Sequence, residues 1–555
     1  MKNFGLQKYA VLIIPLLFLL YSAPSALDYI FYFPDEKYYT DAVLQMMEKD
    51  DFFTPYKADG SPRFLKPIAT YWVLMGSYKI FGVSPFSSRL FFWLTGALLI
   101  AITFLMAKSI SGNHKIAITA AFITAANPLV LLSASRSIPD ILLTLFLTIS
   151  AWGFLEIMIS EKPLRRFYWM AYLGAALAFE TKGLPAVVFA GASMLYLLLN
   201  PWKRIKFKNL FETYSLVISI LVAISWFAIM YATHGANYLG SFFEDQVGGR
   251  VSSKTLQVLN NAALGILNLI AFLIPWVIIA FSNPKQQRTF ISTSDNRQKS
   301  VFGFILLWVI LIILMSGAVF KFYDRYVLPV IPLVAILLAS LLHLSKTRFK
   351  KGIISILLVL NVTALVINVL YAIFILSTTI LIFAVILVFN IIAQYKFGVF
   401  RNASSDVVIA NGILLLYFSL FVLLNPLLMP NPGKQLVVNL KNNGIVENSR
   451  VYVYGNIRTA SNIRIQSHHK MNVISMDTVY TIPATPNHFL VFDKRDQNRL
   501  DLTNYEIEKG SEEWLRVPVS KFPDFLQKPV LKIKEGGTTY FIAKPKSYPY
   551  EKPEQ

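Results

Sequence analysis

The sequence has no cysteine among its 555 residues and only six histidines. Without cysteine the chain can form no disulfide, has no thiol nucleophile and holds no metal through thiolates. Its apolar part also lacks the spacing of two histidines and an acid that is typical of zinc sites. We expect the adjacent His468 and His469 to lie in a solvated turn. The sequence therefore assigns no metal-binding residue, and it leaves open whether a divalent metal ion is needed.

Acidic residues are also scarce, with 31 Asp and Glu against 52 Lys and Arg, which gives a formal net charge of +21. A basic excess of this size is typical of proteins that bind nucleic acid. Here, however, the Lys and Arg residues lie in short clusters between long apolar runs. That pattern is typical of cytoplasmic loops of membrane proteins. We therefore expect a membrane protein without a nucleic-acid partner.

Apolar residues make up 55% of the chain, and the mean hydropathy is +0.53. Runs of about 20 apolar residues predict membrane-spanning helices. We predict thirteen spans, at residues 9–27, 88–107, 116–133, 139–158, 167–180, 183–200, 214–232, 262–281, 301–320, 326–343, 352–370, 372–393 and 407–426. With a cytoplasmic N-terminus, every inside loop is basic and the short outside loops carry few cations, which supports the count and the orientation. The first run resembles a signal peptide, but the later spans favour an uncleaved first helix.

The predicted spans divide the chain into two domains. Residues 1–426 form a transmembrane domain, within which residues 28–87 are a large outside loop. After Pro430, Pro432 and Gly433 the pattern changes to short β-type runs, "RVYVYG", "MNVIS", "HFLVFD" and "TTYFIAKP". Residues 427–555 therefore predict a small outside α/β domain of ordinary size.

The large outside loop contains two helix starts with opposite charges. Asp35 and Glu36 open an amphipathic segment, where the helix dipole favours acids. Lys66 stands before Pro67 at a second helix start, and a helix N-terminus with a lysine is an anion site. The run that follows is too short to span and predicts an interfacial helix. Taken alone, these are ordinary helix-start acids and a lysine that reaches toward lipid headgroups.

More ionisable residues lie at the same outer ends of the spans, and these are Asp140, Lys182, His234, Glu244, Asp245, Arg250, Lys321 and Arg325. Such charges on one side of a polytopic protein predict a shared polar cavity. Acids there can orient or deprotonate a hydroxyl, and cations can hold a phosphate. The cavity would suit a phosphate-bearing lipid whose head group reacts at the outer surface.

Five segments in this order resemble the C-type, polyprenyl-phosphate-dependent membrane glycosyltransferases. They are "DEKYYTDAVLQM", "FLKPIATYW", Asp140 at a span end, "TKG" and "KFYDRYVLPVIP", within residues 9–345. The branch most similar is the lipid A aminoarabinose transferases, relatives of the protein O-mannosyltransferases. Two positions depart from that branch: Tyr38 stands where Arg is usual, and Leu65 where Glu is usual.

The resemblance implies roles for particular residues. Asp35 would be the principal catalytic acid, with Glu36 beside it and Asp140 as a second carboxylate. The donor phosphate would be held by Lys66, Lys182, Lys321, Arg325 and Tyr326. Three further residues would line the same cavity, namely Tyr39, His234 and Arg250.

The expected function is transfer of a sugar from a polyprenyl-phosphate carrier to an acceptor outside the cytoplasm. The sugar (aminoarabinose, mannose or similar) and the acceptor (lipid A, another surface glycan or a protein) stay open. The resemblance implies an inverting reaction in a bacterial inner membrane, with the site facing the periplasm. A lipid or solute transporter is the alternative from another class, although transporters tend to place charges near the bilayer midplane and in repeated halves. An oligosaccharyltransferase or a polysaccharide polymerase or ligase is a third possibility within the same chemistry.

Overall fold

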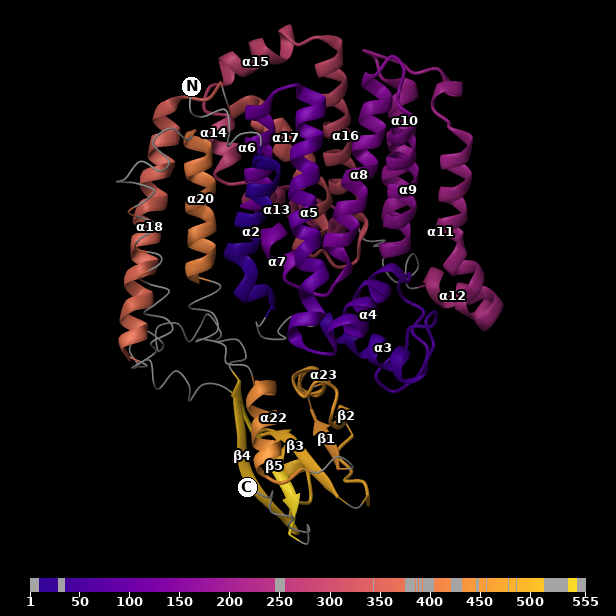
Figure 1. Cartoon of the computed structure of the whole chain (residues 1–555), viewed down its shortest axis with the longest axis vertical. Coiled ribbons are helices and arrows are strands. Elements are labelled where there is room, and N and C mark those ends of the chain that lie inside the picture. The colour runs from indigo at the N-terminus through magenta and orange to yellow at the C-terminus, as the bar shows by residue number, and fades with distance from the viewer. Residues whose placement is uncertain are drawn as a thin grey trace.

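The computed structural model describes residues 9–27, 35–244, 255–342, 344–374, 404–420, 432–445, 449–455, 457–477, 479–485, 487–513 and 538–546, and the single positions 385, 388 and 392. These residues form a bundle of long helices above a smaller sheet (Figure 1). Two short helices of the first loop, α3 and α4, lie at the lower end of the bundle, which is the end that faces the sheet (Figure 1).

The bundle is made of mostly apolar helices, many of which coincide with predicted spans, together with short helices between them such as the polar α15. In chain order they are α2 (Ala10–Leu27), α5 (Pro85–Ser111), α6 (His114–Ala125), α7 (Pro128–Ala134), α8 (Pro139–Ile159), α9 (Arg165–Lys182), α10 (Leu184–Leu199), α11 (Thr213–His234), α12 (Ala236–Phe243), α13 (Thr255–Phe272), α14 (Trp276–Ala280), α15 (Pro284–Thr293), α16 (Asn296–Ala318), the 3₁₀ helix η3 (Asp324–Val330), α17 (Ile331–Leu342), α18 (Thr347–Phe374) and α20 (Ser405–Tyr417).

Seven helical segments among the described residues are long and apolar enough to cross a membrane, or eight if the bent pair α6 and α7 forms one span. Three shorter apolar helices, in α2, α10 and α20, add to them. The structure therefore supports a polytopic helical bundle, but it does not establish the predicted count of thirteen spans. Most of the predicted span 372–393 lies outside the described residues.

Small residues let the helices near the centre of the bundle pack closely. A Cβ atom on Gly153 of α8 would lie 2.3 Å from the backbone nitrogen of Ala171 on α9. One on Gly174 of α9 would lie 2.9 Å from the backbone nitrogen of Ser150. Such contacts between small residues are typical of helix pairs in membranes. They bring the ends of α8 and α9, which carry Asp140 and Lys182, to one place.

The first loop folds into the two predicted short helices. Helix α3 spans Glu36–Glu48, and its apolar face buries Tyr39, Val43 and Met46, as the helical spacing predicts. Helix α4 spans Ala69–Phe81, and at 13 residues it is too short to cross a bilayer. The Tyr78 hydroxyl lies 2.7 Å from that of Ser88, which ties α4 to α5. The helical part of the first loop is therefore packed firmly against the end of the bundle.

The C-terminal part contains a mixed five-stranded sheet in the order β2-β1-β3-β5-β4. Its strands are β1 (Arg450–Tyr454), β2 (Asn472–Asp477), β3 (His488–Asp493), β4 (Tyr505–Glu513) and β5 (Thr538–Pro545). Strands β1, β2 and β3 are parallel, and β5 is antiparallel to β3 and β4. The helices α22 (Pro432–Asn442) and α23 (Ile457–Gln466) share an apolar core with the sheet. The predicted domain boundary at residue 427 lies outside the described residues.

Helix α23 docks on α3 through polar contacts. The Arg464 guanidinium lies 2.7 Å from the Asp41 carboxylate, and both side chains are buried. Ser461 and Thr40 approach to 3.2 Å beside this pair. The predicted solvated turn at His468 and His469 is confirmed, since His468 is exposed and His469 is half-buried, and the turn also contacts the bundle. His468 Nδ1 is 2.9 Å from the carbonyl oxygen of Val83, and His469 Nε2 is 2.9 Å from Glu48.

The buried pair between Arg464 and Asp41 is expected to stabilise the docking of the two parts. Replacing Arg464 by Ala leaves the buried Asp41 carboxylate without its cation. Breaking a buried ion pair in this way costs about 3–5 kcal/mol of folding stability. We expect the midpoint of thermal unfolding in detergent to fall by several degrees. Lys203→Ala is the control, because its partner Glu161 has a side chain that is 90% exposed, so no buried carboxylate loses its cation. Equal shifts for the two variants would contradict this account.

Candidate active site

Two adjoining cavities lie at the lower end of the bundle. One, the apolar cavity, has a volume of about 200 Å³ and extends among α8, α10, α16 and η3. The other, the charged cavity, has a volume of about 290 Å³ and lies between the start of α3 and the ends of the bundle helices. Both are lined by Val319 and by five residues with polar side chains, Lys66, Asp140, Lys182, Arg325 and Tyr326. These residues therefore form the junction between an apolar space and a polar one.

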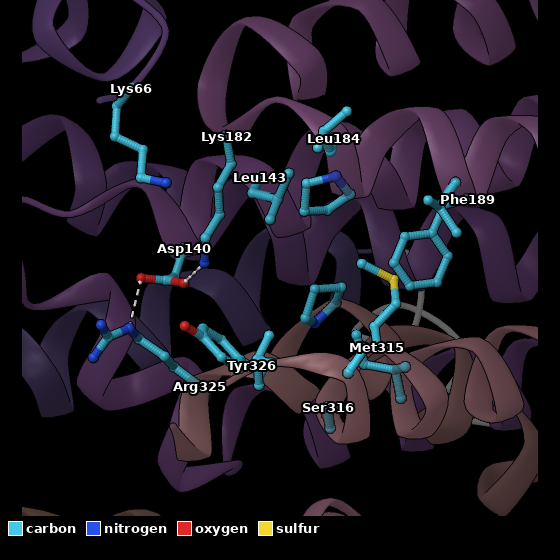
Figure 2. A pocket seen from close by; sticks show the side chains of 16 residues that line it. Lys66, Asp140, Leu143, Lys182, Leu184, Phe189, Met315, Ser316, Arg325 and Tyr326 are labelled. Carbon is cyan, nitrogen blue, oxygen red and sulfur yellow. Dashed lines mark hydrogen bonds and ion pairs between the residues drawn. The ribbon is translucent and has the colours of Figure 1, made fainter. Parts of the chain in front are cut away.

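The apolar cavity has a charged end and an apolar end. Figure 2 shows Lys66, Lys182 and Arg325 around Asp140 at one end. The other end is lined by Leu143, Leu184, Phe189 and Met315, among other apolar side chains. Such a space suits a hydrocarbon chain that carries an anionic head.

Asp140 is the centre of the charged end. It lies in the first turn of α8 after Pro139 and is 3% exposed. Its Oδ1 is 2.6 Å from Lys182 Nζ, and its Oδ2 is 3.3 Å from Arg325 Nε (Figure 2). Lys182 ends α9, where the helix dipole favours a cation. A buried carboxylate between two cations holds both of them in fixed positions.

Asp35 stands at the N-cap of α3 but does not cap the helix. Its side chain accepts no hydrogen bond from the first turn, although Asp at this position commonly does. Its Oδ2 lies instead 2.6 Å from Arg325 Nη2, and the side chain remains 38% exposed in the charged cavity. Asp35 is therefore not an ordinary helix-start acid, because its carboxylate faces the cavity.

Glu36 points away from the cavities and is completely buried. Arg89 donates two hydrogen bonds to it, from Nε at 3.0 Å and Nη2 at 2.9 Å. The backbone N–H of Ser137 donates a third, at 2.9 Å. Glu36 thus joins α3 to α5 and to the loop before α8, and so it holds Asp35 and Asp140 near each other.

Removal of Glu36 is expected to destabilise the protein strongly. Glu36→Ala removes the carboxylate that pairs with the buried guanidinium of Arg89, and breaking such a pair costs about 3–5 kcal/mol. The double variant with Arg89→Leu should recover part of that loss, because both buried charges are then gone. Thermal unfolding of the three variants in detergent measures this coupling. Additive losses in the double variant would contradict the pairing.

The other predicted site residues divide into those in the cavities and those elsewhere. Tyr39 and Lys321 line the charged cavity, and Lys182 lies 5.1 Å from the ring centre of Tyr326. Burial raises the pKa of Tyr39 well above its usual value, so its phenol keeps its proton at neutral pH. The Lys66 ammonium points toward Asp140 (Figure 2).

His234 does not line either cavity. Its Nε2 lies 3.0 Å from the hydroxyl oxygen of Thr54, and its ring packs 5.0 Å from that of Phe64. It therefore attaches the first loop to the end of α11. Arg250, the remaining predicted site residue, lies outside the described residues.

Among the polar and aromatic residues of the charged cavity, sequence reasoning did not single out Tyr38, Arg63 or Tyr323 as site residues. The Arg63 guanidinium lies 4.7 Å from the ring centre of Tyr38, and Arg63 is 8% exposed. A signal was present, because Arg63 is three residues before Lys66 and adds a cation to that helix start. Arg89, the partner of Glu36, was missed as well, since nothing in the local sequence links it to α3.

The charges of the two cavities favour an anion. Together they contain two carboxylates, Asp35 and Asp140, and five cations, Arg63, Lys66, Lys182, Lys321 and Arg325. The cations can bind phosphate oxygens, and the half-exposed Asp35 can accept a proton from, or orient, a second reactant. Among the described residues, no group of three His, Asp or Glu side chains is placed to hold a metal ion.

Comparisons with known proteins agree with this chemistry. The family of dolichyl-phosphate-mannose-protein mannosyltransferases matches residues 65–229, which include Lys66, Asp140 and Lys182. An uncharacterized protein of Aquifex aeolicus is 28% identical over 351 residues, 63% of this chain and 66% of its own length. An undecaprenyl phosphate-α-4-amino-4-deoxy-L-arabinose arabinosyl transferase of Pectobacterium carotovorum is 28% identical over 314 residues. That match covers 55% of this chain and 54% of the relative, so the chain spans half to two thirds of these relatives.

Solved structures match over nearly the whole chain. The crystal structure of ArnT from Cupriavidus metallidurans bound to undecaprenyl phosphate has a TM-score of 0.70 at 16% identity, and covers 99% of this chain and 100% of that one. Its apo form has a TM-score of 0.69. The chain is therefore an integral membrane protein with the polytopic C-type glycosyltransferase fold. The resemblance inferred from five short segments is confirmed.

Proposed function

We propose that this protein transfers a sugar from a polyprenyl-phosphate carrier to an acceptor at the outer face of a bacterial inner membrane. The observation that carries the proposal is the junction of the two cavities, where an apolar space ends in a cluster of cations beside Asp35. The names of the relatives, which include an undecaprenyl phosphate-aminoarabinose transferase, support this reading.

The donor would lie along the apolar cavity. Its polyprenyl tail would contact residues such as Leu184, Phe189 and Met315, and its phosphate would meet Lys66, Lys182 and Arg325. During transfer the bond between the anomeric carbon and the phosphate oxygen breaks, and polyprenyl phosphate leaves with the electron pair. Cations fixed around that oxygen stabilise the charge that develops on it.

The acceptor would approach from the charged cavity, on the side of Asp35. Its oxygen forms the new bond to the anomeric carbon. If that oxygen belongs to a hydroxyl, Asp35 takes its proton as general base. If it belongs to a phosphate, no base is needed and Asp35 orients the reacting groups. In both cases Arg325, which is 2.6 Å from Asp35, links the acceptor side to the donor side.

Glu36 and Asp140 serve this chemistry by positioning rather than by touching both reactants. Glu36 is buried against Arg89 and Ser137, so we propose that it fixes the start of α3. Asp140 lines both cavities, but its two oxygens are paired with Lys182 and Arg325. It would hold these cations at the phosphate.

The sugar is aminoarabinose or mannose in the names of the matched relatives and family. Aminoarabinose is the sugar that we propose to test first, because the matches to such enzymes extend over more of the chain. The departures at Tyr38 and Leu65 lie next to the site residues and distinguish this chain from that branch.

Binding of two matched lipids tests the proposal. The purified protein in lipid nanodiscs is titrated with undecaprenyl phosphate and, as the control, with undecaprenol, which lacks the phosphate. Tight binding of the phosphate alone is expected, because the cation cluster recognises the charged head. Equal affinity for the two lipids would contradict the proposal and favour a transporter of apolar lipids.

A further inference from the structure

A third cavity, here the interdomain cavity, lies between the first loop and the C-terminal sheet. Its volume is about 1170 Å³, larger than the other two. One wall comes from α3 and the loop after it, and the other comes from β2 and the turn before it. Small-molecule sites commonly have volumes of about 300–1,000 Å³, so this space suits a ligand of several sugar rings.

The walls of the interdomain cavity present both hydrogen-bond donors and acceptors. Lys57 and Lys470 are exposed donors, and Asp59 and Asp477 are exposed acceptors. A ligand that supplies both donors and acceptors therefore fits this lining.

The charges of the interdomain cavity are balanced, unlike those of the charged cavity. Four carboxylates face four Lys or Arg side chains and one His. Two of the carboxylates are already paired, Asp41 with Arg464 and Glu48 with His469. A lining of this kind favours a polar ligand without strong net charge, which excludes an acyl chain and a second phosphate carrier as the best occupant.

We propose that the interdomain cavity binds the oligosaccharide part of the acceptor. This inference rests on the proposed function. It adds that the acceptor carries a glycan of several sugar units, which is held outside the bilayer. Sugar hydroxyls both donate and accept hydrogen bonds, so they match a lining that offers both Lys and Asp side chains.

The interdomain cavity adjoins the charged cavity. Tyr38 and Arg63 line it and also line the charged cavity that contains Asp35. The Arg63 guanidinium lies 4.7 Å from the ring centre of Tyr38, so this pair stands between the two spaces. A glycan held by β2 and α3 would thus direct one of its ends past this pair to Asp35. The C-terminal sheet would choose the acceptor, while the bundle holds the donor.

The absence of cysteine makes a direct test simple. A single cysteine is placed in the cavity wall at Asn472, an exposed residue at the start of β2. The matched control is Val479→Cys, which is exposed in the same part of the chain and does not line the cavity. Membranes that contain endogenous donor and acceptor are treated with a polyethylene glycol maleimide or with a reagent that adds only a methylthio group. Because labelling follows folding, an effect on folding does not confuse the result.

We expect the bulky label on Asn472→Cys to slow transfer about tenfold or more, the effect of losing about 1.4 kcal/mol of acceptor binding. The small methylthio group on Asn472→Cys should leave the transfer rate near that of the same variant without a label. Either label on Val479→Cys should likewise leave the transfer rate of that variant unchanged. Undecaprenyl phosphate binding should be unchanged in every case. Full transfer by the bulky Asn472→Cys conjugate would overturn the inference while leaving the proposed function in place. An unlabelled protein that neither binds undecaprenyl phosphate nor transfers sugar would instead overturn the proposed function, and this inference with it.

Discussion

Replacing Asp35 by Asn is expected to slow sugar transfer by about 10²- to 10⁴-fold, the usual contribution of a general base. The change removes the negative charge but keeps the shape of the side chain. If Asp35 only orients the reactants, the loss should lie near the lower end, because misplacement of a reactant costs about 10²-fold. Binding of undecaprenyl phosphate should not weaken, since the substitution leaves every cation of the site in place. Initial rates of transfer and a binding titration on the same preparation measure both quantities.

Asp50→Asn is the matched control for this variant. Asp50 is an exposed residue just after α3, with a positive φ of 51° that Asn also tolerates. It should transfer sugar at the wild-type rate. If Asp35→Asn keeps at least half of the wild-type rate, the assignment of Asp35 fails, whatever the acceptor is.

Replacing Lys66 by Ala should act on the donor instead. A hydrogen bond to a charged group contributes about 1.5–3 kcal/mol, which corresponds to a loss of about 10- to 150-fold in affinity for undecaprenyl phosphate. Lys66→Arg should retain most of the affinity because it keeps the charge. Calorimetric or fluorescence titration with undecaprenyl phosphate in nanodiscs gives the dissociation constants.

Lys79→Ala is the control for Lys66→Ala, because Lys79 lies in the last turn of the neighbouring α4 and is exposed. Its ammonium lies 3.9 Å from the ring centre of Phe52, away from both cavities. Its removal should leave donor affinity unchanged. Equal losses for the two lysines would indicate a general effect of surface charge rather than a phosphate site.

Much of the fold follows from local sequence patterns. The apolar face of α3, with Tyr39 and Val43, is visible from helical spacing alone, and four of the five strands coincide with short β-type runs. Strand β4 was missed because "YEIEKGSEE" is rich in charge and lacks a long apolar run. It is an edge strand, paired only with β5 among the described strands, and such strands tolerate charged residues.

The site was predictable as a set of residues but not as a geometry. Position at the outer ends of the spans places Asp35, Asp140, Lys182 and Arg325 on one side. The sequence does not show that Glu36 pairs with Arg89, or that Asp35 pairs with Arg325 across 290 positions of the chain. Two adjacent acids at one helix start therefore look alike in sequence. They differ in space, because successive residues of a helix point in different directions. Asp35 therefore faces the charged cavity, whereas Glu36 faces the buried core.

Mass spectrometry of surface glycolipids and glycoproteins gives the most direct test of the central claim. Cells that lack the chromosomal copy would carry the wild type, Asp35→Asn, Lys66→Ala or Asp50→Asn at matched protein levels. We predict that one sugar-sized mass is present with the wild type and Asp50→Asn and absent or strongly reduced with the other two, which would identify the sugar and its acceptor together. If every glycan is unchanged in both Asp35→Asn and Lys66→Ala, the protein is not the transferase proposed, and transport of a lipid or solute becomes the better account.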